Sequence, residues 1–465
     1  MALQGMSTVS ITGNETGALQ DDYPIAWERE VGTFSANLQP HRQTDITMQL
    51  QCLFKLFARE SSSNESCPDR HTSRAPISSP SLGTLGATSI MATARLLRPS
   101  PNCLSSVRKH TTSFQTRSYS ASPSTSPATP TTSPFAPRHL LSIADLTPHE
   151  LTTLVRNAAK HKTTIKSSST TPAALQNSLL GKTIALMFSK RSTRTRVSME
   201  GAIAHMGGHP MFLGSQDIQL GTNESLYDTS VVVSSMTAAM VARVNAHADV
   251  ADLAKHSSVP VINALSDLYH PLQTLADYLT LHEAFPSTQT EPSSTSLGLE
   301  GLKIAWIGDA NNVLFDLAIG AAKLGCELAV ATPPSHRIPD HMRDIIISSA
   351  PENSPFNMAA TTVPEEAVKN ADIIVTDTWI SMGQESEKAQ RLKEFAGFQV
   401  TEEMAKRGGA KEGWRFMHCL PRHQEEVSDD VFYGPRSLVF PEAENRLWSA
   451  VAALEGFVVN RGKIA

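Results

Sequence analysis

The stretch Lys182-Thr-Ile-Ala-Leu-Met-Phe-Ser-Lys-Arg-Ser-Thr-Arg-Thr-Arg196 passes from an apolar run into a loop rich in hydroxyl and guanidinium groups. The apolar run predicts a buried parallel strand, and the residues Met199, Ile203 and Met206 that follow have the spacing of a helix. A strand, a polar loop and a helix N-terminus in this order form an anion site, because the free N–H groups and the helix dipole favour phosphate. Arg194 adds a bidentate geometry that lysine lacks.

A solvated basic turn is the alternative interpretation of this loop. Ser192, Thr193 and Thr195 interleave with Arg194, however, and this mixture favours an anion site over a simple run of charge. The nucleotide-binding pattern G-x-x-x-x-G-K-[ST] is absent, and we therefore do not expect a P-loop.

Apolar runs of strand length alternate with helical patterns through the rest of the chain, which predicts an α/β fold of two doubly wound parallel-sheet domains. Order is predicted to begin near Leu140, and Thr147-Pro148-His149-Glu150 forms a capping box at the start of a helix. The further runs with strand character are Pro260–Asn263, Lys303–Ile307, Glu327–Ala331 and Asp372–Val375, and the helical patterns are Leu272–Phe285 and Leu314–Leu324.

The overall charge excludes some kinds of partner. Among 465 residues there are 40 Lys and Arg against 45 Asp and Glu, and this balance argues against nucleic acid or an anionic membrane as a partner. No apolar run approaches the roughly 18 residues of a membrane-spanning helix. The five cysteines are widely spaced and contain no C-x-x-C pair, which indicates neither zinc nor a redox couple and fits a reducing compartment.

The N-terminal part has a different composition. Between Met91 and Ala144 there is no Asp or Glu, whereas Arg, Ser, Thr and Pro are frequent. This composition is typical of a mitochondrial or plastid transit peptide, which starts at the initiator methionine. We therefore expect residues 1–90 to be a disordered extension that the native product lacks, and residues 91–137 to be a transit peptide and linker, with processing near Arg117-Ser-Tyr-Ser120. An ordinary disordered tail is the alternative.

The tetrapeptide His270-Pro271-Leu272-Gln273 gives the phosphate loop a partner. Together with Ser192-Thr-Arg-Thr-Arg196 it resembles the ornithine carbamoyltransferases, and the resemblance runs from about Leu140 to the C-terminus. A lone histidine is more often structural than catalytic, and the tetrapeptide gains weight only from the phosphate loop in the same chain. The resemblance implies that carbamoyl phosphate is bound by the following residues: Ser192, Thr193, Arg194, Thr195, Gln219, Arg243, His270, Gln273, Cys419, Leu420 and Arg446.

Within this set the resemblance implies particular roles. Gln219 would reach into the site of a neighbouring subunit, although a polar loop residue is the alternative there. His418-Cys-Leu-Pro-Arg422 would place Cys419 at the amine of ornithine and the carbonyl of Leu420 at the carbamoyl group. Arg446 would return to the phosphate from the last helix.

The second substrate is expected on the second domain. Asp377 follows a buried strand, where open α/β sheets bind ligands, although a strand-terminal Asp is often only a helix cap. Ser381-Met382-Gly383 is similar to the ornithine loop of the family. Gly308-Asp-Ala-Asn-Asn312 lacks the glycines of a dinucleotide site, and the resemblance makes Asn312 an ornithine ligand, while Asn311 fits turn chemistry.

The resemblance implies the transfer of a carbamoyl group to ornithine, with Cys419, Asp377, Arg243 and His270 as the catalytic residues. It also implies a homotrimer in the mitochondrial matrix, without a cofactor or metal. We expect residues 138–274 with 444–465 to bind carbamoyl phosphate and residues 275–443 to bind ornithine. An acceptor such as aspartate or putrescine, a dinucleotide-dependent dehydrogenase and a non-catalytic regulatory relative are the alternatives.

Overall fold

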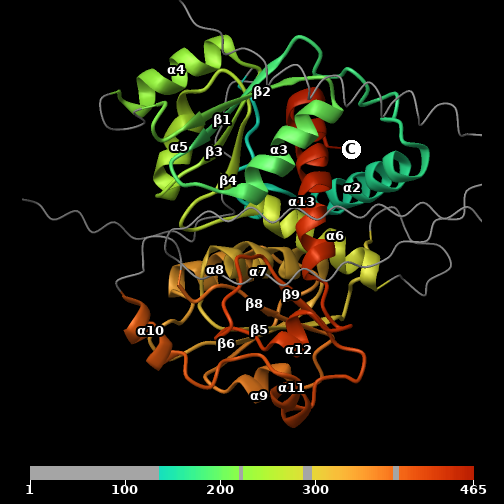
Figure 1. Cartoon of the computed structure of the whole chain (residues 1–465), viewed down its shortest axis with the longest axis vertical. Helices are drawn as coiled ribbons and strands as arrows, with labels where there is room; N and C mark the ends of the chain where they lie inside the picture. The colour runs from blue at the N-terminus through green and yellow to red at the C-terminus, as the bar shows by residue number, and fades with distance from the viewer. Residues whose placement is uncertain (1–135, 219–223, 286–295, 381–386, 465) are drawn as a thin grey trace, which may run out of the picture. The chain divides into compact units, whose positions relative to one another are not determined.

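The computed structural model describes residues 136–218, 224–285, 296–380 and 387–464. Residues 1–135, which include nearly all of the predicted disordered extension and transit peptide (residues 1–137), lie outside the described residues. The described residues form two parallel sheets with helices packed against them, which confirms the predicted α/β class (Figure 1). No helix in these ranges is long and apolar enough to cross a membrane.

The first sheet has four parallel strands in the order β2-β1-β3-β4. The order in which strands are added reverses between β1 and β3, because β2 follows β1 on one side while β3 and β4 extend the sheet on the other. Such a switch point opens a crevice at the carboxyl ends of the strands. The strands are β1 Thr183–Phe188, β2 His209–Gly214, β3 Ala239–Arg243 and β4 Val261–Leu265, and the helices are α3 Thr193–His205, α4 Leu226–Met236 and α5 His247–His256.

The second sheet has five parallel strands in the order β7-β6-β5-β8-β9. Its switch point lies between β5 and β8, and the segments that follow these two strands therefore share a crevice. The strands are β5 Lys303–Ile307, β6 Glu327–Ala331, β7 Met358–Thr361, β8 Ile373–Thr376 and β9 Arg415–His418. The helices are α7 Asn312–Leu324, α8 Asp340–Ser348, α9 Pro364–Val368, α10 Lys388–Glu394, α11 Glu402–Gly408 and α12 Asp429–Phe432.

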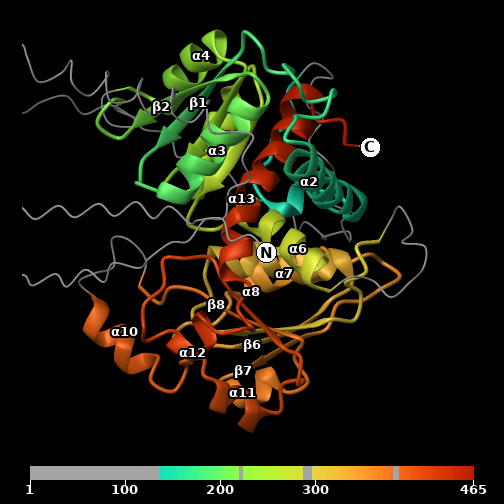
Figure 2. The ribbon, with the colours of Figure 1, turned by 45° about the vertical axis from the view of Figure 1, so that its right-hand side comes forward.

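Three helices connect the sheets. The helices α2 (Pro148–Ser168) and α6 (Pro271–Ala284) pack against α13 (Val439–Leu454), which also contacts α3 and β9. Figure 2 shows α13 running beside α2 and α6 toward the first sheet. The C-terminal helix thus returns to the part of the molecule where the described chain begins, and the predicted boundary at residue 444 falls inside it. A short 3-10 turn, Ile143–Asp145, and a π-helical turn, Glu455–Val459, flank these helices.

The strands predicted from apolar runs are all present, and Thr147 caps α2 with the predicted capping box. Four strands were not predicted: β2, β3, β7 and β9. β2 is an edge strand with a proline and a half-exposed face, and β7 is an edge strand of only four residues, three of them small. β3 and β9 are short and each ends on a basic side chain, Arg243 and His418, which hides the strand pattern.

Candidate active site

The phosphate loop lies where the first sheet opens. Ser192 is the N-cap of α3, and its side-chain oxygen accepts a hydrogen bond from the backbone N–H of Thr195 at 3.3 Å. Thr193 is the first residue of the helix, which leaves the early N–H groups of α3 free for a ligand. The Arg194 guanidinium donates to the carbonyl oxygen of Leu420 at 2.5 Å, a residue that follows the second sheet. The predicted loop therefore lies at the junction of the two sheets.

Two more guanidinium groups lie beside this loop. Arg243 ends β3, next to β1, and Arg446 comes from α13, and both are buried. Burial and the neighbouring positive charges lower the pKa of Arg243 to about 10. Burial, together with the positive charge of Arg194, likewise lowers the pKa of Arg446 to about 10, although nearby acidic groups oppose this shift. Both side chains remain positively charged at neutral pH and form a cationic site.

His270 faces the same cationic group. It is the N-cap residue of α6, is only 3% exposed, and has no hydrogen-bond partner at Nδ1 among the described residues. Burial, and then the charges of Arg446 and Arg243, hold the pKa of His270 well below its ordinary value. The imidazole is therefore neutral at physiological pH, with one free ring nitrogen for a ligand.

The last helix ties these groups together. Arg446 donates to the side-chain oxygen of Gln273 at 2.7 Å and to the hydroxyl of Thr195 at 3.3 Å. The structure thus brings the phosphate loop, the His270–Gln273 motif and the C-terminal arginine into one cluster, although they lie far apart in the sequence.

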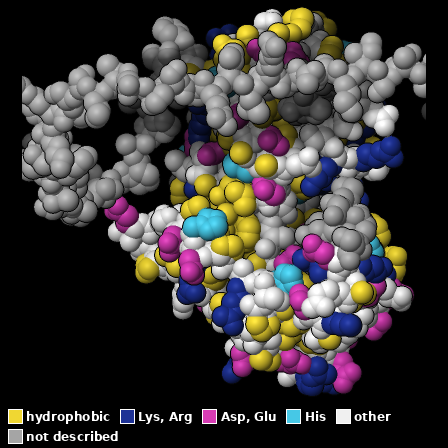
Figure 3. All heavy atoms as spheres, turned by 90° about the vertical axis from the view of Figure 1, so that its left-hand side faces the viewer, with side chains coloured by type: hydrophobic (Ala, Val, Ile, Leu, Met, Phe, Trp, Pro, Cys, Tyr) yellow, Lys and Arg dark blue, Asp and Glu magenta, His cyan; other side chains and the backbone are white. Residues whose placement is uncertain are grey.

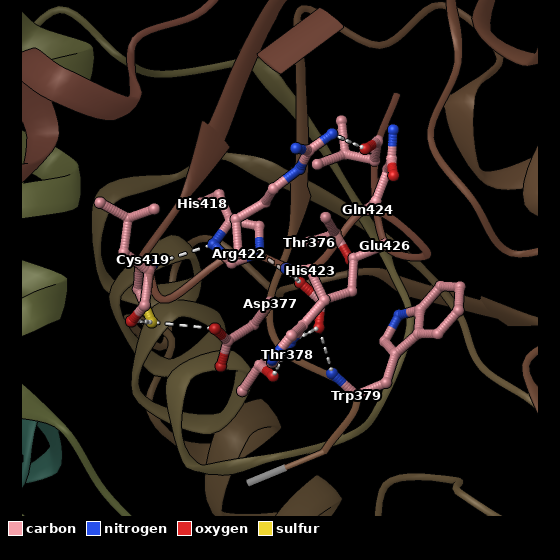
Figure 4. A network of polar contacts seen from close by, with 12 residues as sticks. Thr376, Asp377, Thr378, Trp379, His418, Cys419, Arg422, His423, Gln424 and Glu426 are labelled. Carbon is pink, nitrogen blue, oxygen red and sulfur yellow. Dashed lines mark hydrogen bonds and ion pairs between the residues drawn. The ribbon is translucent and has the colours of Figure 1, made fainter. Parts of the chain in front are cut away.

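The acceptor side is built around Asp377, which follows β8 at the switch point of the second sheet. One carboxylate oxygen accepts from the Cys419 thiol at 2.9 Å, and the other accepts from the side-chain amide of Asn311 at 2.7 Å. Figure 4 shows Asp377 and Cys419 pointing toward one another. Burial, and then the charge of Asp377, raise the pKa of Cys419 well above its ordinary value. Cys419 is therefore a thiol that donates a hydrogen bond, not a thiolate.

The loop after β5 completes this side. Asn311 caps α7, because its side-chain oxygen accepts from the N–H groups of Val313 and Leu314, as its predicted turn chemistry requires. Its amide nitrogen also reaches Asp377, a contact that the sequence did not predict. The amide nitrogen of Asn312 donates to the carbonyl of Ser266 at 2.6 Å, at the end of the first sheet.

A glycine is required just before these amides. Gly308 has φ +135°, and a Cβ at this position would lie 3.1 Å from the indole nitrogen of Trp379. The loop therefore retains one glycine for close approach to the Asp377 segment, without the dinucleotide pattern.

A buried carboxylate supports the Cys419 loop from behind. Glu426 accepts from the backbone N–H of Trp379 at 3.1 Å and lies 3.1 Å from Nε2 of His418 (Figure 4). His418 Nδ1 accepts from the backbone N–H of Leu420 at 2.9 Å, and Nε2 therefore carries the proton in the neutral ring. Glu426 thus links the Asp377 segment to the loop that carries Cys419. Sequence reasoning missed this residue, since no local pattern marks it.

Other predicted residues cannot be placed. Gln219, Ser381 and Met382 lie outside the described residues. Sequence reasoning also missed three buried acids near the site, Asp277, Asp316 and Glu442. The i, i+4 spacing of Gln273 with Asp277 and of Glu442 with Arg446 was the available signal for two of them. Among the described residues, no group of three or more His, Cys, Asp or Glu side chains is arranged to hold a metal ion.

Comparison with known proteins gives this geometry a family. Residues 138–283 match the aspartate/ornithine carbamoyltransferase, carbamoyl-P binding domain, and residues 300–456 match the aspartate/ornithine carbamoyltransferase, Asp/Orn binding domain. The chain belongs to the aspartate/ornithine carbamoyltransferase family, and it is therefore an enzyme that transfers a group. Its similarities within the family are to ornithine carbamoyltransferases, as the sequence predicted.

Among the similar curated proteins is the mitochondrial ornithine carbamoyltransferase of Emericella nidulans, 71% identical over 333 residues, which covers 71% of this chain and 92% of that protein. The mitochondrial enzyme of Schizosaccharomyces pombe is 56% identical over 330 residues, covering 70% and 96% of the two chains. A crystal structure of the Coccidioides immitis mitochondrial ornithine carbamoyltransferase has 65% sequence identity and a TM-score of 0.66, covering 71% of this chain and all of that one (100%). The ornithine type of the family is thus confirmed.

Proposed function

We propose that the chain transfers the carbamoyl group of carbamoyl phosphate to the δ-amine of L-ornithine and yields L-citrulline and phosphate. One observation carries this proposal: Arg194 of the phosphate loop bonds the carbonyl of Leu420, while the preceding residue, Cys419, bonds Asp377. The anion site and the amine site therefore meet at two consecutive residues. The family membership and the similarity to ornithine carbamoyltransferases support the same reaction.

The carbamoyl phosphate would be held by the cationic cluster. The hydroxyls of Ser192, Thr193 and Thr195 and the free N–H groups of α3 would bind the phosphate oxygens, with Arg194 across them. Arg243 and neutral His270 would polarise the carbonyl oxygen, and each such preorganised donor contributes about 10² to 10³ in rate. Arg446 and Gln273 would complete the binding of the carbamoyl end, and the carbonyl of Leu420 would accept from its amino group.

Ornithine would be held by Asp377 and Cys419. A primary ammonium group has a pKa near 10.4, and it must lose a proton before its nitrogen can attack. The nitrogen then forms a bond to the carbonyl carbon, and the bond from that carbon to the phosphate oxygen breaks. Since the Cys419 thiol is held protonated, we propose that it orients the nitrogen and does not form a covalent intermediate. Asn312, Ser381 and Met382 would bind the amino-acid end.

We also propose the assembly and location that the sequence predicted. Exposed hydrophobic side chains on α4, Tyr227, Val231, Val232 and Met236, offer a surface for other copies of the chain in a homotrimer, to which Gln219 would contribute. Figure 3 shows hydrophobic side chains gathered at mid-height on the face that corresponds to the left-hand side of Figure 1. The acid-free segment from residue 91 and the mitochondrial names of the relatives support a place in the mitochondrial matrix.

The domain assignment stays a proposal of the same kind. Residues 138–274 with 444–465 would bind carbamoyl phosphate, and residues 275–443 would bind ornithine. The positions of Arg194 and Arg446 on one side and of Asp377 on the other support this division.

Citrulline formation by purified protein tests the function. We expect the full chain to form citrulline from carbamoyl phosphate and ornithine, and not to carbamoylate aspartate or putrescine at a comparable rate. Arg194→Leu should lower kcat/KM by at least about 10²-fold, the scale of one transition-state donor. Arg196→Leu is the matched control, because the Arg196 guanidinium instead pairs with Glu200 and stacks on Phe212. Citrulline formed by Arg194→Leu at the rate of the control would refute the assignment.

A further inference from the structure

Two buried acids lie beside the active site without a part in the mechanism above. Asp277 is on α6, four residues after Gln273, and Glu442 is on α13, four residues before Arg446. Residues four apart lie on the same face of a helix. The facing sides of α6 and α13 therefore present four polar side chains to one another, Gln273, Asp277, Glu442 and Arg446, which we call the Gln273 quartet.

Hydrogen bonds within the quartet use every polar group of the Gln273 amide. Its nitrogen donates to Oδ1 of Asp277 at 2.8 Å and to Oε1 of Glu442 at 2.7 Å. Its oxygen accepts from Arg446 at 2.7 Å. Rotation of the amide by half a turn would place its N–H groups against the guanidinium and its oxygen against two carboxyl oxygens. The two acids therefore fix which end of the amide faces Arg446.

Glu442 also reaches the other substrate side. Its second carboxyl oxygen accepts from the backbone N–H of His418 at 3.0 Å, one residue before Cys419. The same carboxyl group thus joins Gln273, in the carbamoyl phosphate cluster, to the strand end that carries the ornithine-facing thiol. A displacement of this group would move the two substrate sides relative to one another.

Burial disfavours the charged form of both acids. Asp277 and Glu442 are 3% and 2% exposed, and two such carboxylates on one amide nitrogen would repel each other strongly. Burial raises the pKa of Asp277 to about 7 and the pKa of Glu442 well above its ordinary value. Protonation of one of the two carboxyl groups would remove this repulsion.

Other charges around the pair act in both directions. Arg446 lowers the pKa of Asp277, whereas the negative charge of Asp377 raises the pKa of both acids. The ring of His418 bonds Glu426 through Nε2. The charges of Arg446 and Asp377 therefore have opposite effects on the pKa of Asp277.

We propose that Asp277 and Glu442 are positioning residues for carbamoyl transfer. They hold the Gln273 amide with its oxygen toward Arg446, and Glu442 also fixes the backbone of His418 relative to this amide. The inference rests on the proposed function, because it assigns Gln273 and Arg446 to carbamoyl phosphate. Neither acid touches a substrate. Their effect on catalysis passes through Gln273 and through the strand end at His418.

Two substitutions of Asp277 separate positioning from simple stability. Asp277→Asn keeps the acceptor for Gln273 and carries no negative charge that could repel Glu442. Its kcat/KM for carbamoyl phosphate should stay within about threefold of the wild type, since the amide keeps its orientation. Asp277→Leu has the same branched shape, with a larger volume, but no acceptor. It should lower kcat/KM for carbamoyl phosphate about 30- to 100-fold, as expected for a misplaced binding group, with less than about threefold change in the KM of ornithine.

A control variant lies in the same helix interface. Asn445, next to Arg446, donates to Thr280 and Glu283 of α6 and accepts from Lys162 of α2. Asn445→Leu should lower the melting temperature as much as Asp277→Leu and leave both KM values unchanged, because this network does not include Gln273. If Asp277→Leu does not fold, Asp277→Ser, which is too short to reach the amide, takes its place with the same expectation.

The outcomes are distinct. A variant without the acceptor at residue 277 that melts earlier but keeps the wild-type kcat and KM would overturn the inference, as would an Asp277→Asn protein as impaired as Asp277→Leu. The wild-type full chain is assayed first with ornithine, because absence of citrulline would count against the proposed function itself. In that case calorimetric titration with carbamoyl phosphate still tests the inference: unweakened binding to Asp277→Leu refutes it.

Discussion

Replacing Asp377 by asparagine tests the acceptor side of the site with little change in shape. In the wild type both carboxylate oxygens accept, one from Cys419 at 2.9 Å and one from Asn311 at 2.7 Å. Asparagine can keep its oxygen toward Asn311 and turn its N–H₂ group toward the sulfur, which is a weak acceptor. The fold should therefore be retained, while the negative charge for the substrate ammonium is lost.

The size of the effect follows from burial. Asp377 is 5% exposed, and solvent does not screen its charge appreciably. Truncating one partner of a buried charged hydrogen bond costs about 2 to 5 kcal/mol. Since about 1.4 kcal/mol is tenfold, kcat/KM for ornithine should fall by roughly 30- to 5,000-fold. The KM of carbamoyl phosphate should change little, because Asp377 has no hydrogen bond to Arg194, Arg243 or Arg446.

Steady-state kinetics with each substrate varied in turn measure this split. Circular dichroism and thermal denaturation of Asp377→Asn verify that the protein is folded. An ornithine kcat/KM within about threefold of the wild type would refute the assignment of Asp377 to the amine. An equal loss for both substrates would instead show that Asp377 supports the whole site and not the ammonium.

Three further changes have expected outcomes. Cys419→Ser should raise the ornithine KM more than the carbamoyl phosphate KM, since the thiol bonds Asp377 at 2.9 Å and the carbonyl of Leu420 only at 3.6 Å; equal KM changes would contradict the role given to the thiol. Gly320→Ala should lower the melting temperature, because the added Cβ would lie 2.3 Å from a ring carbon of the fully buried Tyr278. Overpacking of this kind destabilises the fold by about 1 to 3 kcal/mol, whereas the higher helix propensity of alanine stabilises it by about 1 kcal/mol. An unchanged melting temperature would disprove this prediction. Burial raises the pKa of Asp316 from 3.8 to about 7. The protonated carboxyl group therefore adds to the free energy of unfolding fully below pH 3.8, and this contribution is lost as the pH rises through 7. Between these pH values the free energy of unfolding of the wild type should therefore fall relative to Asp316→Asn by roughly 2 to 4 kcal/mol, measured by denaturant titration, and a constant difference would exclude the shift.

Much of the fold could be predicted from local patterns. The strand from Thr183 to Phe188 and the strand from Lys303 to Ile307 are continuous apolar runs, because both faces of a parallel sheet are covered. The strand that ends at Arg243 could not, since its charged last residue serves the site and breaks the run. The order of strands within each sheet was also beyond the sequence, because it depends on long-range packing.

The site shows the same division. Hydroxyl and arginine residues at a helix start, as at Ser192 and Arg194, have a direct physical meaning and predict an anion site on their own. The partners of these residues cannot be predicted from the sequence in this way. The contact between Arg194 and Leu420 joins segments 226 residues apart, and the raised pKa of Asp277 depends on burial that only the packed helices provide. Sequence spacing marks such groups as neighbours on one helix and does not indicate what faces them.

The arrangement of the two sheets explains why the chemistry lies where it does. Each sheet has one switch point, between β1 and β3 in the first and between β5 and β8 in the second, and each switch point opens one crevice at the strand ends. One crevice carries guanidinium groups and a helix N-terminus, which favour an anion; the other carries Asp377, which favours a cation. Transfer between two ligands requires that their reacting atoms approach within about 3 to 3.5 Å, and neither crevice alone can bring them together. The helices α6 and α13 hold the crevices against each other, and we therefore expect the residues between these helices that orient Gln273 to affect the reaction through it, unlike Asn445, whose contacts do not include Gln273.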